Sequence, residues 1–229
     1  MTFPITPAQQ ITLPIYGSAE LRFPVNNIYC VARNYADHAR EMGHDPDREP
    51  PFFFMKPANA LISEHDTFAY PHHCGDVHHE VEMVVAMGEG GRHIDAASAM
   101  RHVYGYAVGL DMTCRDVQTA AKQQGRPWES AKAFAGSAPC SQIMPASICG
   151  HPQSDDLALS LNGELRQEGA LPQMIWQTAE LISTLSKTFQ LEAGDLIYTG
   201  TPAGVGPVQP GDVLEASLGK IAHLTLHVV

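Results

Sequence analysis

Apolar and polar residues alternate in short runs along most of this 229-residue chain, and turns rich in glycine and proline separate the runs. Such runs are typical of β-strands, whose side chains point alternately to opposite faces. We expect sheet to dominate, especially toward the C-terminus. The predicted strands are Ile28–Ala32, Phe52–Met55, His79–Met87, Tyr104–Met112, Leu157–Leu161, Asp195–Thr199, Val213–Ala216 and Ala222–Val229.

Helical periodicity occurs in three places, namely Tyr35–Met42, Arg115–Gln124 and Met174–Phe189. For the first of these helices, Asn34 is the predicted N-cap and Gly43 the C-terminal stop. Because the strands do not alternate regularly with helices, the pattern indicates an α+β fold. We expect one domain over residues 28–229, preceded by a short N-terminal extension, residues 1–27, that carries no motif.

Composition narrows the possible partners. The chain is 44% apolar and 17% charged, and its 25 acidic residues outnumber 14 basic ones, for a net charge of −11. This excess of negative charge argues against nonspecific binding to nucleic acid or to an anionic membrane. No stretch has the length of a signal peptide core or of a membrane span, and the five cysteines lack C-x-x-C spacing. We therefore expect reduced thiols and a cytoplasmic location.

Two acids lie on one predicted strand face. Glu80 and Glu82 alternate with Val81 and Met83, so their Cα atoms should be about 7 Å apart on the same side of the strand. A solvated strand face would explain the pair without any special role. The flanking apolar residues imply burial, however, where an unpaired acid pair is costly, so we favour a bound metal.

A third acid, Asp111, closes the apolar run that starts at Tyr104. It could cap the following helix, but Thr113 begins a capping-box pattern and would leave Asp111 free. Three carboxylates without cysteine suit Mg²⁺ or Mn²⁺, and Ca²⁺ is also possible. A histidine site for zinc or nickel competes with this interpretation, although no H-E-x-x-H spacing occurs; its candidates are His72, His73, His78 and His79.

His38 and Glu41 stand three residues apart on the first predicted helix, so they share a face and could activate a water together. An ordinary surface His–Glu pair is the alternative. The loop that follows, from Gly43 to Pro46, would allow this helix to move as a lid.

Two lysines adjoin apolar runs. Lys56 follows three phenylalanines and a methionine, and Lys132 precedes Phe134. Snorkelling side chains or contact with an anionic substrate would both account for them. Near the C-terminus, the glycine-rich run from Gly200 to Pro207 follows a strand, and its backbone N–H groups and hydroxyls could hold a carboxylate.

Taken together, these stretches resemble the fumarylacetoacetate hydrolase family, in particular its short acylpyruvate and fumarylpyruvate hydrolase branch. The resemblance runs in order from about Ile28 to the end of the chain. It rests on Arg33–His38 with Glu41, Phe54–Pro57, His79–Glu82, Leu110–Asp111, Arg115–Gln118, Pro127–Trp128 with Lys132, Asn162–Glu164 and Thr199–Pro202.

The resemblance implies a mixed β-sandwich roll with peripheral helices, a homodimer, and Mg²⁺ or Mn²⁺ held by Glu80, Glu82 and Asp111. It further implies that His38 and Glu41, on a mobile helix, activate water. Lys132 would be catalytic, and the residues around the substrate would be Arg33, Lys56, Gln118 and Thr201. One departure is Ala135, where many relatives carry an acid, and it bears on the pocket rather than on the metal.

The expected activity is the metal-dependent hydrolysis of a C–C bond in an acylpyruvate, with fumarylpyruvate giving fumarate and pyruvate in the catabolism of aromatic compounds. Decarboxylation of oxaloacetate or a related β-keto acid is the alternative. A cation-binding or purely structural β protein is a third possibility. The acyl group depends on pocket shape, to which a loop over Glu164–Leu171 is expected to contribute.

Overall fold

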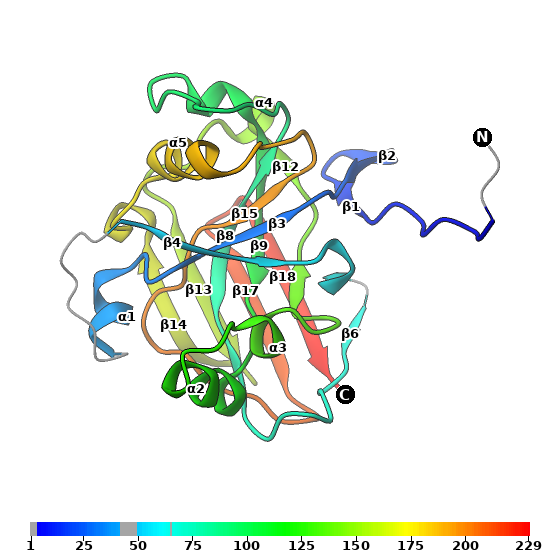
Figure 1. The fold of residues 1–229 in the computed structure, drawn as a ribbon, viewed down its shortest axis with the longest axis vertical. Helices are drawn as coiled ribbons and strands as arrows, with labels where there is room; N and C mark the ends of the chain where they lie inside the picture. The colour runs from blue at the N-terminus through cyan, green and yellow to red at the C-terminus, as the bar shows by residue number, and fades with distance from the viewer. Residues whose placement is uncertain (1–3, 42–49, 65) are drawn as a thin grey trace.

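The computed structural model describes residues 4–41, 50–64 and 66–229, with the backbone alone for residues 39–41. The central feature is an eight-stranded mixed sheet (Figure 1). Its order is β4 (Phe52–Lys56), β3 (Ile28–Ala32), β15 (Leu196–Tyr198), β8 (Val81–Met87), β9 (Val103–Leu110), β11 (Ala138–Cys140) and β5 (Leu61–Ser63), while β12 (Met144–Pro145) also pairs with β9.

A five-stranded sheet packs against one face of this central sheet. It runs in the order β14 (Glu164–Ala170), β13 (Asp156–Leu161), β17 (Val213–Leu218), β18 (Ala222–Val228) and β6 (Thr67–Phe68). Met83, Val85 and Val108 of the central sheet share one apolar core with Leu159 and Leu226 of the second sheet. The two sheets therefore form the sandwich that the family resemblance implies, and the mixture of sheets and helices confirms the α+β prediction.

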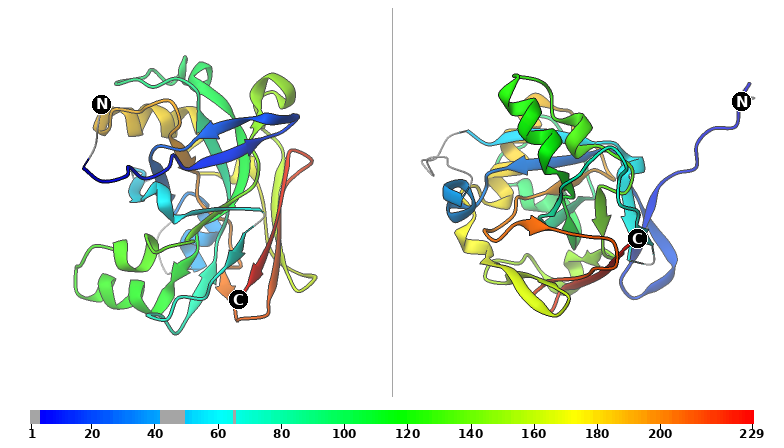
Figure 2. Two further views of the ribbon diagram at one scale, coloured as in Figure 1. Left: turned by 90° about the vertical axis from the view of Figure 1, so that its right-hand side faces the viewer. Right: turned by 90° about the horizontal axis from the view of Figure 1, so that it is seen from below.

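The opposite face of the central sheet is also buried. There Val84, Ala86 and Ala107 pack in a second core with Leu13 and Phe23. The latter two come from an antiparallel hairpin, β1 (Thr12–Ile15) and β2 (Ser18–Pro24), within the segment expected to be a featureless extension. The described residues that precede the hairpin extend away from the rest of the domain (Figures 1 and 2). Burial on both faces explains why every residue of β8 is buried and why its sequence is a nearly continuous apolar run.

Helices lie at the margins of the sandwich. The α-helices are α1 (Ala36–Glu41), α2 (Arg115–Gln123), α3 (Glu129–Lys132), α4 (Ala146–Cys149) and α5 (Thr178–Thr188), and the 3₁₀ helices are η1 (Ala58–Ala60), η2 (Ala99–His102) and η3 (Leu171–Gln173). In Figure 1, α2 and α3 lie together at the lower end of the molecule, and α4 and α5 lie at the upper end. None of the helices in the described ranges is long and apolar enough to cross a membrane.

The predicted strand over His79–Met87 is interrupted at Glu80. Residues Val77–His79 form a separate strand, β7, in a small sheet with β10 (Thr113–Cys114) and β16 (Gly206–Pro207). The main chain thus leaves one sheet and enters another at Glu80. This break brings Glu80 next to the end of β9, where the Asp111 N–H donates to the Glu80 carbonyl at 2.8 Å.

Two predicted helix caps are wrong. Helix α1 begins at Ala36, and Asn34 is buried, with its side-chain amide bonded to the carbonyls of Trp176 and Thr199. Helix α2 has Cys114 as its N-cap without a side-chain cap bond, while the Thr113 hydroxyl donates to the Asp111 carbonyl. The Asn34 side chain is thus used in tertiary contacts, and the Thr113 hydroxyl in a bond to the backbone two residues earlier, so neither side chain caps its helix.

Two other segments differ from expectation. Residues Glu164–Ala170 are strand β14 rather than a loop, because they pair along β13 in the hairpin that turns at Asn162 and Gly163. Helix α5 begins at Thr178 rather than at Met174, and the Gln177 N–H donates to the Glu180 carboxylate at 3.0 Å. The loop over residues 43–46, which was expected to let the first helix move as a lid, lies outside the described residues.

Candidate active site and metal centre

Three carboxylates meet at one end of the central sheet. Glu82 lies on β8 opposite Gly109 of β9, Glu80 stands at the start of β8, and Asp111 follows the end of β9. Oxygen atoms from the three groups all lie within 4.8 Å of one another, and all three residues are buried. The predicted cluster of Glu80, Glu82 and Asp111 is therefore brought together by strand pairing.

Close approach of the chain behind this cluster requires glycine at position 109. A Cβ atom there would lie 2.6 Å from the ring of Tyr198 and 2.8 Å from the Val84 side chain. The ring of Tyr198 thus fills the space beside Gly109, and its hydroxyl contacts the Pro139 carbonyl at 3.1 Å. This packing holds β8, β9 and β15 together directly beneath the acids.

Lys132 enters the carboxylate cluster from α3. Its Nζ donates to Glu80 Oε2 at 2.8 Å, to Asp111 Oδ2 at 2.6 Å and to the Thr113 hydroxyl at 2.6 Å. Burial alone would lower the pKa of Lys132, but the carboxylates of Asp111 and Glu80 outweigh it and raise that pKa. Lys132 therefore remains a cation inside the protein.

The acids of the cluster differ in their own electrostatics. Burial favours the neutral form of Glu80, yet the charges of Lys132 and Arg115 hold the pKa of this carboxyl well below its usual range. For Glu82, burial and the neighbouring carboxylates of Asp111 and Glu80 raise the pKa well above its usual range. The Gly200 N–H donates a hydrogen bond to Glu82 Oε2 at 2.7 Å. The glycine-rich run after β15 thus holds a carboxylate of the chain itself.

The donor set fits a hard divalent cation. All three groups offer carboxylate oxygens, which are the ligands that Mg²⁺ and Mn²⁺ prefer. Asp111 Oδ1 is buried without a hydrogen-bond partner; Lys56 Nζ lies 2.8 Å away, at ion-pair distance but without hydrogen-bond alignment. A cation among these oxygens would favour the ionised form of Glu82 and so lower its raised pKa. It would also give Asp111 Oδ1, which accepts no hydrogen bond, a partner.

A cavity opens above the carboxylates. The residues that line it are Val31, Ala32, Arg33, His38, Phe54, Glu80, Glu82, Asp111, Arg115, Gln118, Lys122, Trp128, Lys132 and Thr201. The structure thus gathers in one cavity most of the side chains that the sequence selected.

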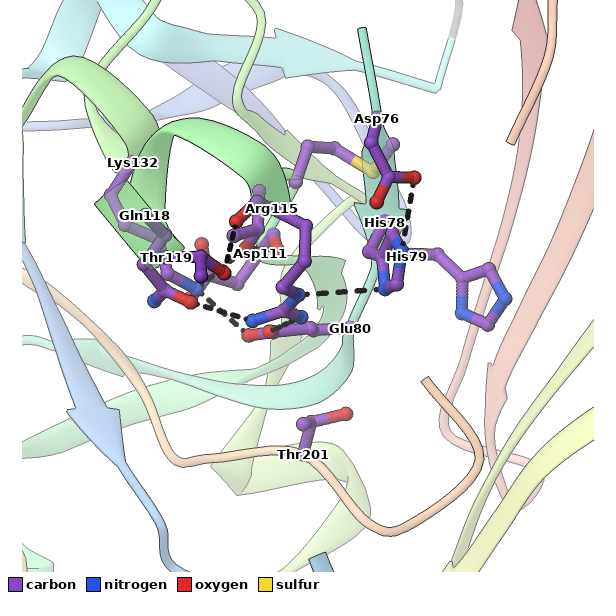
Figure 3. A network of polar contacts seen from close by, with 12 residues as sticks. Asp76, His78, His79, Glu80, Asp111, Arg115, Gln118, Thr119, Lys132 and Thr201 are labelled. Atoms are coloured by element: carbon purple, nitrogen blue, oxygen red, sulfur yellow. Dashed lines mark hydrogen bonds and ion pairs between the residues drawn. The ribbon is translucent and has the colours of Figure 1, made fainter. Parts of the chain in front are cut away.

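Arg115 organises one wall of this cavity. It contacts Glu80 Oε1 at 2.5 Å, the Gln118 side-chain oxygen at 2.7 Å and His78 Nδ1 at 3.4 Å (Figure 3). Burial and the Arg115 charge lower the pKa of His78. Through these contacts Gln118 is fixed on the wall, while His78 stands beside the acids as a neighbour of Arg115.

Lys122 extends the same wall of α2. Its Nζ lies 4.9 Å from the centre of the Trp128 ring. Burial, together with the like charges of Arg115, Arg33 and Lys132, lowers the pKa of Lys122 to about 8. Neither Lys122 nor Arg33 forms an ion pair with another residue in the described parts of the chain. The cavity wall therefore carries positive charge that no described acid compensates.

Arg33 lies at the end of β3 with a φ of 59°, in the left-handed region that non-glycine residues rarely adopt. Such strain persists only where the surroundings enforce it, and it is frequent at functional sites. The neighbouring Asn34 amide, bonded to the carbonyls of Trp176 and Thr199, holds the chain here. Arg33 is thereby turned to the cavity.

The sequence-predicted residues are not all in the cavity. His38 lines it and is buried, but the side chain of Glu41 lies outside the described residues. Lys56 is 1% exposed and does not line the cavity; it lies behind Asp111 and donates to the carbonyls of Met112, at 3.3 Å, and of Lys132. This placement does not support the expectation that Lys56 contacts a substrate, and it makes Lys56 a charge partner of Asp111.

Three contributors were not among the predicted site residues. Arg115 and Lys122 flank Gln118 at spacings of three and four, so a polar stripe at positions 115, 118 and 122 was a readable signal for one helix face. Gln167 of β14 gave no local signal, because it reaches the site only through tertiary contacts with Val81 and with the 199–202 segment.

Comparison with known proteins places these features in a family. The structure matches that of fumarylpyruvate hydrolase from Pseudomonas aeruginosa in complex with Mn²⁺ and pyruvate, with a TM-score of 0.96, 47% identity, and coverage of 100% of this chain and 99% of that one. Oxaloacetate tautomerase YcgM of Escherichia coli (strain K12) is 46% identical over 200 residues, 87% of this chain and 91% of that protein.

A mitochondrial oxaloacetate decarboxylase of Dictyostelium discoideum is 42% identical over 192 residues, 83% of this chain and 88% of that protein. The sequence profile described as Fumarylacetoacetate (FAA) hydrolase C-terminal matches residues 27–229. The chain belongs to the fumarylacetoacetate hydrolase family.

Proposed function

We propose that this chain is a metal-dependent hydrolase that cleaves the C–C bond of an acylpyruvate, with fumarylpyruvate giving fumarate and pyruvate. The observation that carries the proposal is the cavity, which has three carboxylates at its base and, on its wall, two cations, Arg33 and Lys122, that form no ion pair with an acid among the described residues. The similarity to the P. aeruginosa fumarylpyruvate hydrolase, over the whole chain, supports it. Glu80, Glu82 and Asp111 would hold Mg²⁺ or Mn²⁺, which when bound supplies a Lewis acid for a 2-oxo acid.

The charge of the wall suits a substrate with two carboxylates. Fumarylpyruvate carries one at each end, and only one of them adjoins the 2-oxo group. We assign Arg33 and Lys122 to the other carboxylate, because both line the cavity without a described acidic partner. Gln118 and Thr201 would add hydrogen bonds along the substrate.

The chemical step requires a water that attacks the distal keto carbon. His38, buried on the cavity wall, would accept a proton from that water, and Glu41 is proposed to assist from the same helix. The C–C bond then breaks, and its electron pair passes to the pyruvate half as an enolate. Lys132 would stabilise that negative charge until a proton arrives.

Oxaloacetate is the second candidate substrate, and the curated relatives favour it about equally, since the E. coli and Dictyostelium proteins act on it by name. It is also a dicarboxylic 2-oxo acid, so the same wall would suit it. Tautomerisation moves a proton between carbon and the enol oxygen, whereas decarboxylation breaks a C–C bond and releases CO₂. Neither reaction needs an attacking water.

Product analysis tests the choice. Purified protein with Mn²⁺ should convert fumarylpyruvate to equal amounts of fumarate and pyruvate, measured by chromatography. Glu41→Gln and His38→Gln should abolish this hydrolysis while sparing reactions of oxaloacetate that need no water. Turnover of oxaloacetate alone would replace the first candidate by the second, and turnover of neither substrate would refute both.

A further inference from the structure

Gln167 is a buried side chain of β14 that forms four hydrogen bonds beside the cavity. Its Oε1 accepts from the Val81 N–H at 3.1 Å and lies 2.8 Å from His79 Nδ1. Its Nε2 donates to Thr201 Oγ1 at 2.8 Å and to the Pro202 carbonyl at 2.9 Å. The residue is 1% exposed, so no solvent competes for these bonds. Every donor and acceptor position of the amide is thus in use.

Two of the four partners fix which way the amide points. The Val81 N–H can only donate, so the atom that faces it must be the oxygen. The Pro202 carbonyl can only accept, so the atom that faces it must be the nitrogen. A flipped amide would place two donors together and two acceptors together in a buried site, which is costly.

The roles of the other two partners follow from this orientation. His79 Nδ1 must carry a proton, because it faces the amide oxygen. The Thr201 hydroxyl must accept, because it faces an N–H of Gln167. A hydroxyl that accepts this bond keeps its own proton for a different partner, and Thr201 has no acceptor for that proton among the described residues. Since Thr201 lines the cavity, that proton is available there.

We propose that Gln167 is a positioning residue for substrate binding, which commits the Thr201 hydroxyl to donate a hydrogen bond to an anionic oxygen of the bound substrate. The inference rests on the proposed function for the identity of that substrate as a 2-oxo acid. The direction of the Thr201 bond, in contrast, depends only on the hydrogen-bond network of this chain.

The test compares variants at both ends of the Gln167–Thr201 bond. Gln167→Glu replaces the donating NH₂ by an acceptor of the same shape, so the Thr201 proton should turn away from the cavity. Thr201→Val removes the proton altogether, and Thr201→Ser keeps it. We expect Gln167→Glu and Thr201→Val each to weaken pyruvate binding to the Mn²⁺-loaded protein about tenfold. Each should also raise KM about tenfold with little change in kcat. Thr201→Ser should behave nearly as the wild type.

The double variant distinguishes positioning from a merely structural role. If Gln167 acts through Thr201, Gln167→Glu combined with Thr201→Val should bind pyruvate no more weakly than Thr201→Val alone. Additive losses, or unchanged affinity in Thr201→Val, would overturn the proposal. Calorimetry with Mn²⁺ alone should give the wild-type affinity in every variant, and a loss there would also count against it.

A second measurement is independent of both turnover and metal. The ¹⁵N chemical shifts of His79 in the metal-free protein should show Nδ1 protonated and Nε2 unprotonated, because Nδ1 faces the side-chain amide oxygen of Gln167. The opposite tautomer would refute the assigned orientation of Gln167, even if Gln167→Glu fails to fold. If the tautomer is as expected but no 2-oxo acid binds or reacts, the proposed function fails and the network stands.

Discussion

The base and the wall of the cavity are both charged, but their charges are balanced in different ways. At the base, Glu80 and Asp111 are buried and contact Lys132 or Lys56 within 2.8 Å, and both acids adjoin the paired strands β8 and β9. On the wall, Arg33 and Lys122 have no described acidic partner. The difference indicates a division of labour in which the base holds the metal and supports the chemistry, whereas the wall recognises an anion.

The largest effect is expected at the base. Glu82→Gln should abolish Mn²⁺ binding in calorimetry and lower kcat/KM by at least about 10³, because one of three ligands is lost. Since burial and the neighbouring acids raise the Glu82 pKa, its charge destabilises the metal-free fold above the usual pKa of glutamate. The same variant should therefore raise the melting temperature of the metal-free protein. Unchanged Mn²⁺ affinity would rule out the three-carboxylate site, and the exposed Glu164→Gln is the matched control.

Lys132→Met should have the next largest effect, with the opposite sign for stability. Removing the cation takes one of two close cationic partners from each of Glu80 and Asp111, and breaking such a buried pair costs about 3–5 kcal/mol. Thermal melts should show this loss in the metal-free protein, with partial recovery on addition of Mn²⁺. We expect kcat to fall about 10²-fold. Lys187→Met, which alters an exposed lysine, is the control. If Lys132→Met proves as stable and as active as this control, the proposed role of Lys132 is wrong.

A smaller and more selective effect is expected on the wall. Lys122→Met should raise KM for a dicarboxylic 2-oxo acid about tenfold, through loss of a charged hydrogen bond, and leave kcat nearly unchanged. With acetylpyruvate, which lacks the distal carboxylate, KM should barely move. Equal effects on both substrates, measured by steady-state kinetics, would mean that Lys122 does not recognise the second carboxylate.

The smallest expected effect is a pH dependence of substrate binding at the cavity wall. Because folding lowers the Lys122 pKa to about 8, the free enzyme loses this charge as the pH rises through about 8. The groups that face it are Arg115, Arg33, Lys132 and Glu80, and only Glu80 favours its charged form. KM for the dicarboxylic substrate should rise severalfold between pH 7 and pH 9, and Lys122→Arg should flatten this rise. A profile unchanged in Lys122→Arg would assign it to another group.

Most strands and the three-carboxylate cluster were predictable from the sequence, because strand periodicity is local. Alternation placed Glu80 and Glu82 on one face, and Asp111 closed the partner strand, so the β8–β9 register was enough to unite them. Strand β14 was missed because its residues are mostly polar and its register is set by β13. The hairpin β1–β2 was missed because its short apolar runs gain meaning only against the central sheet.

Several side-chain contacts in and around the site could not be predicted, because most of them are tertiary. Lys56 looked like a substrate contact from its apolar neighbours, but the β3–β4 register carries it behind Asp111. Thr113 had the pattern of a helix cap, yet it donates to the Asp111 carbonyl and accepts from Lys132. Gln167 comes from the other sheet and meets Thr201 only across the sandwich. The spacing of these residues along the sequence does not indicate such tertiary contacts.

Metal-dependent turnover of fumarylpyruvate by the purified 229-residue chain tests the role of the three carboxylates most directly. After treatment with a chelator, activity should fall to background, and one equivalent of Mn²⁺ per chain should restore it, with fumarate and pyruvate formed in equal amounts. Full activity in the presence of the chelator, or no cleavage at any Mn²⁺ concentration, would contradict a function built on the three carboxylates.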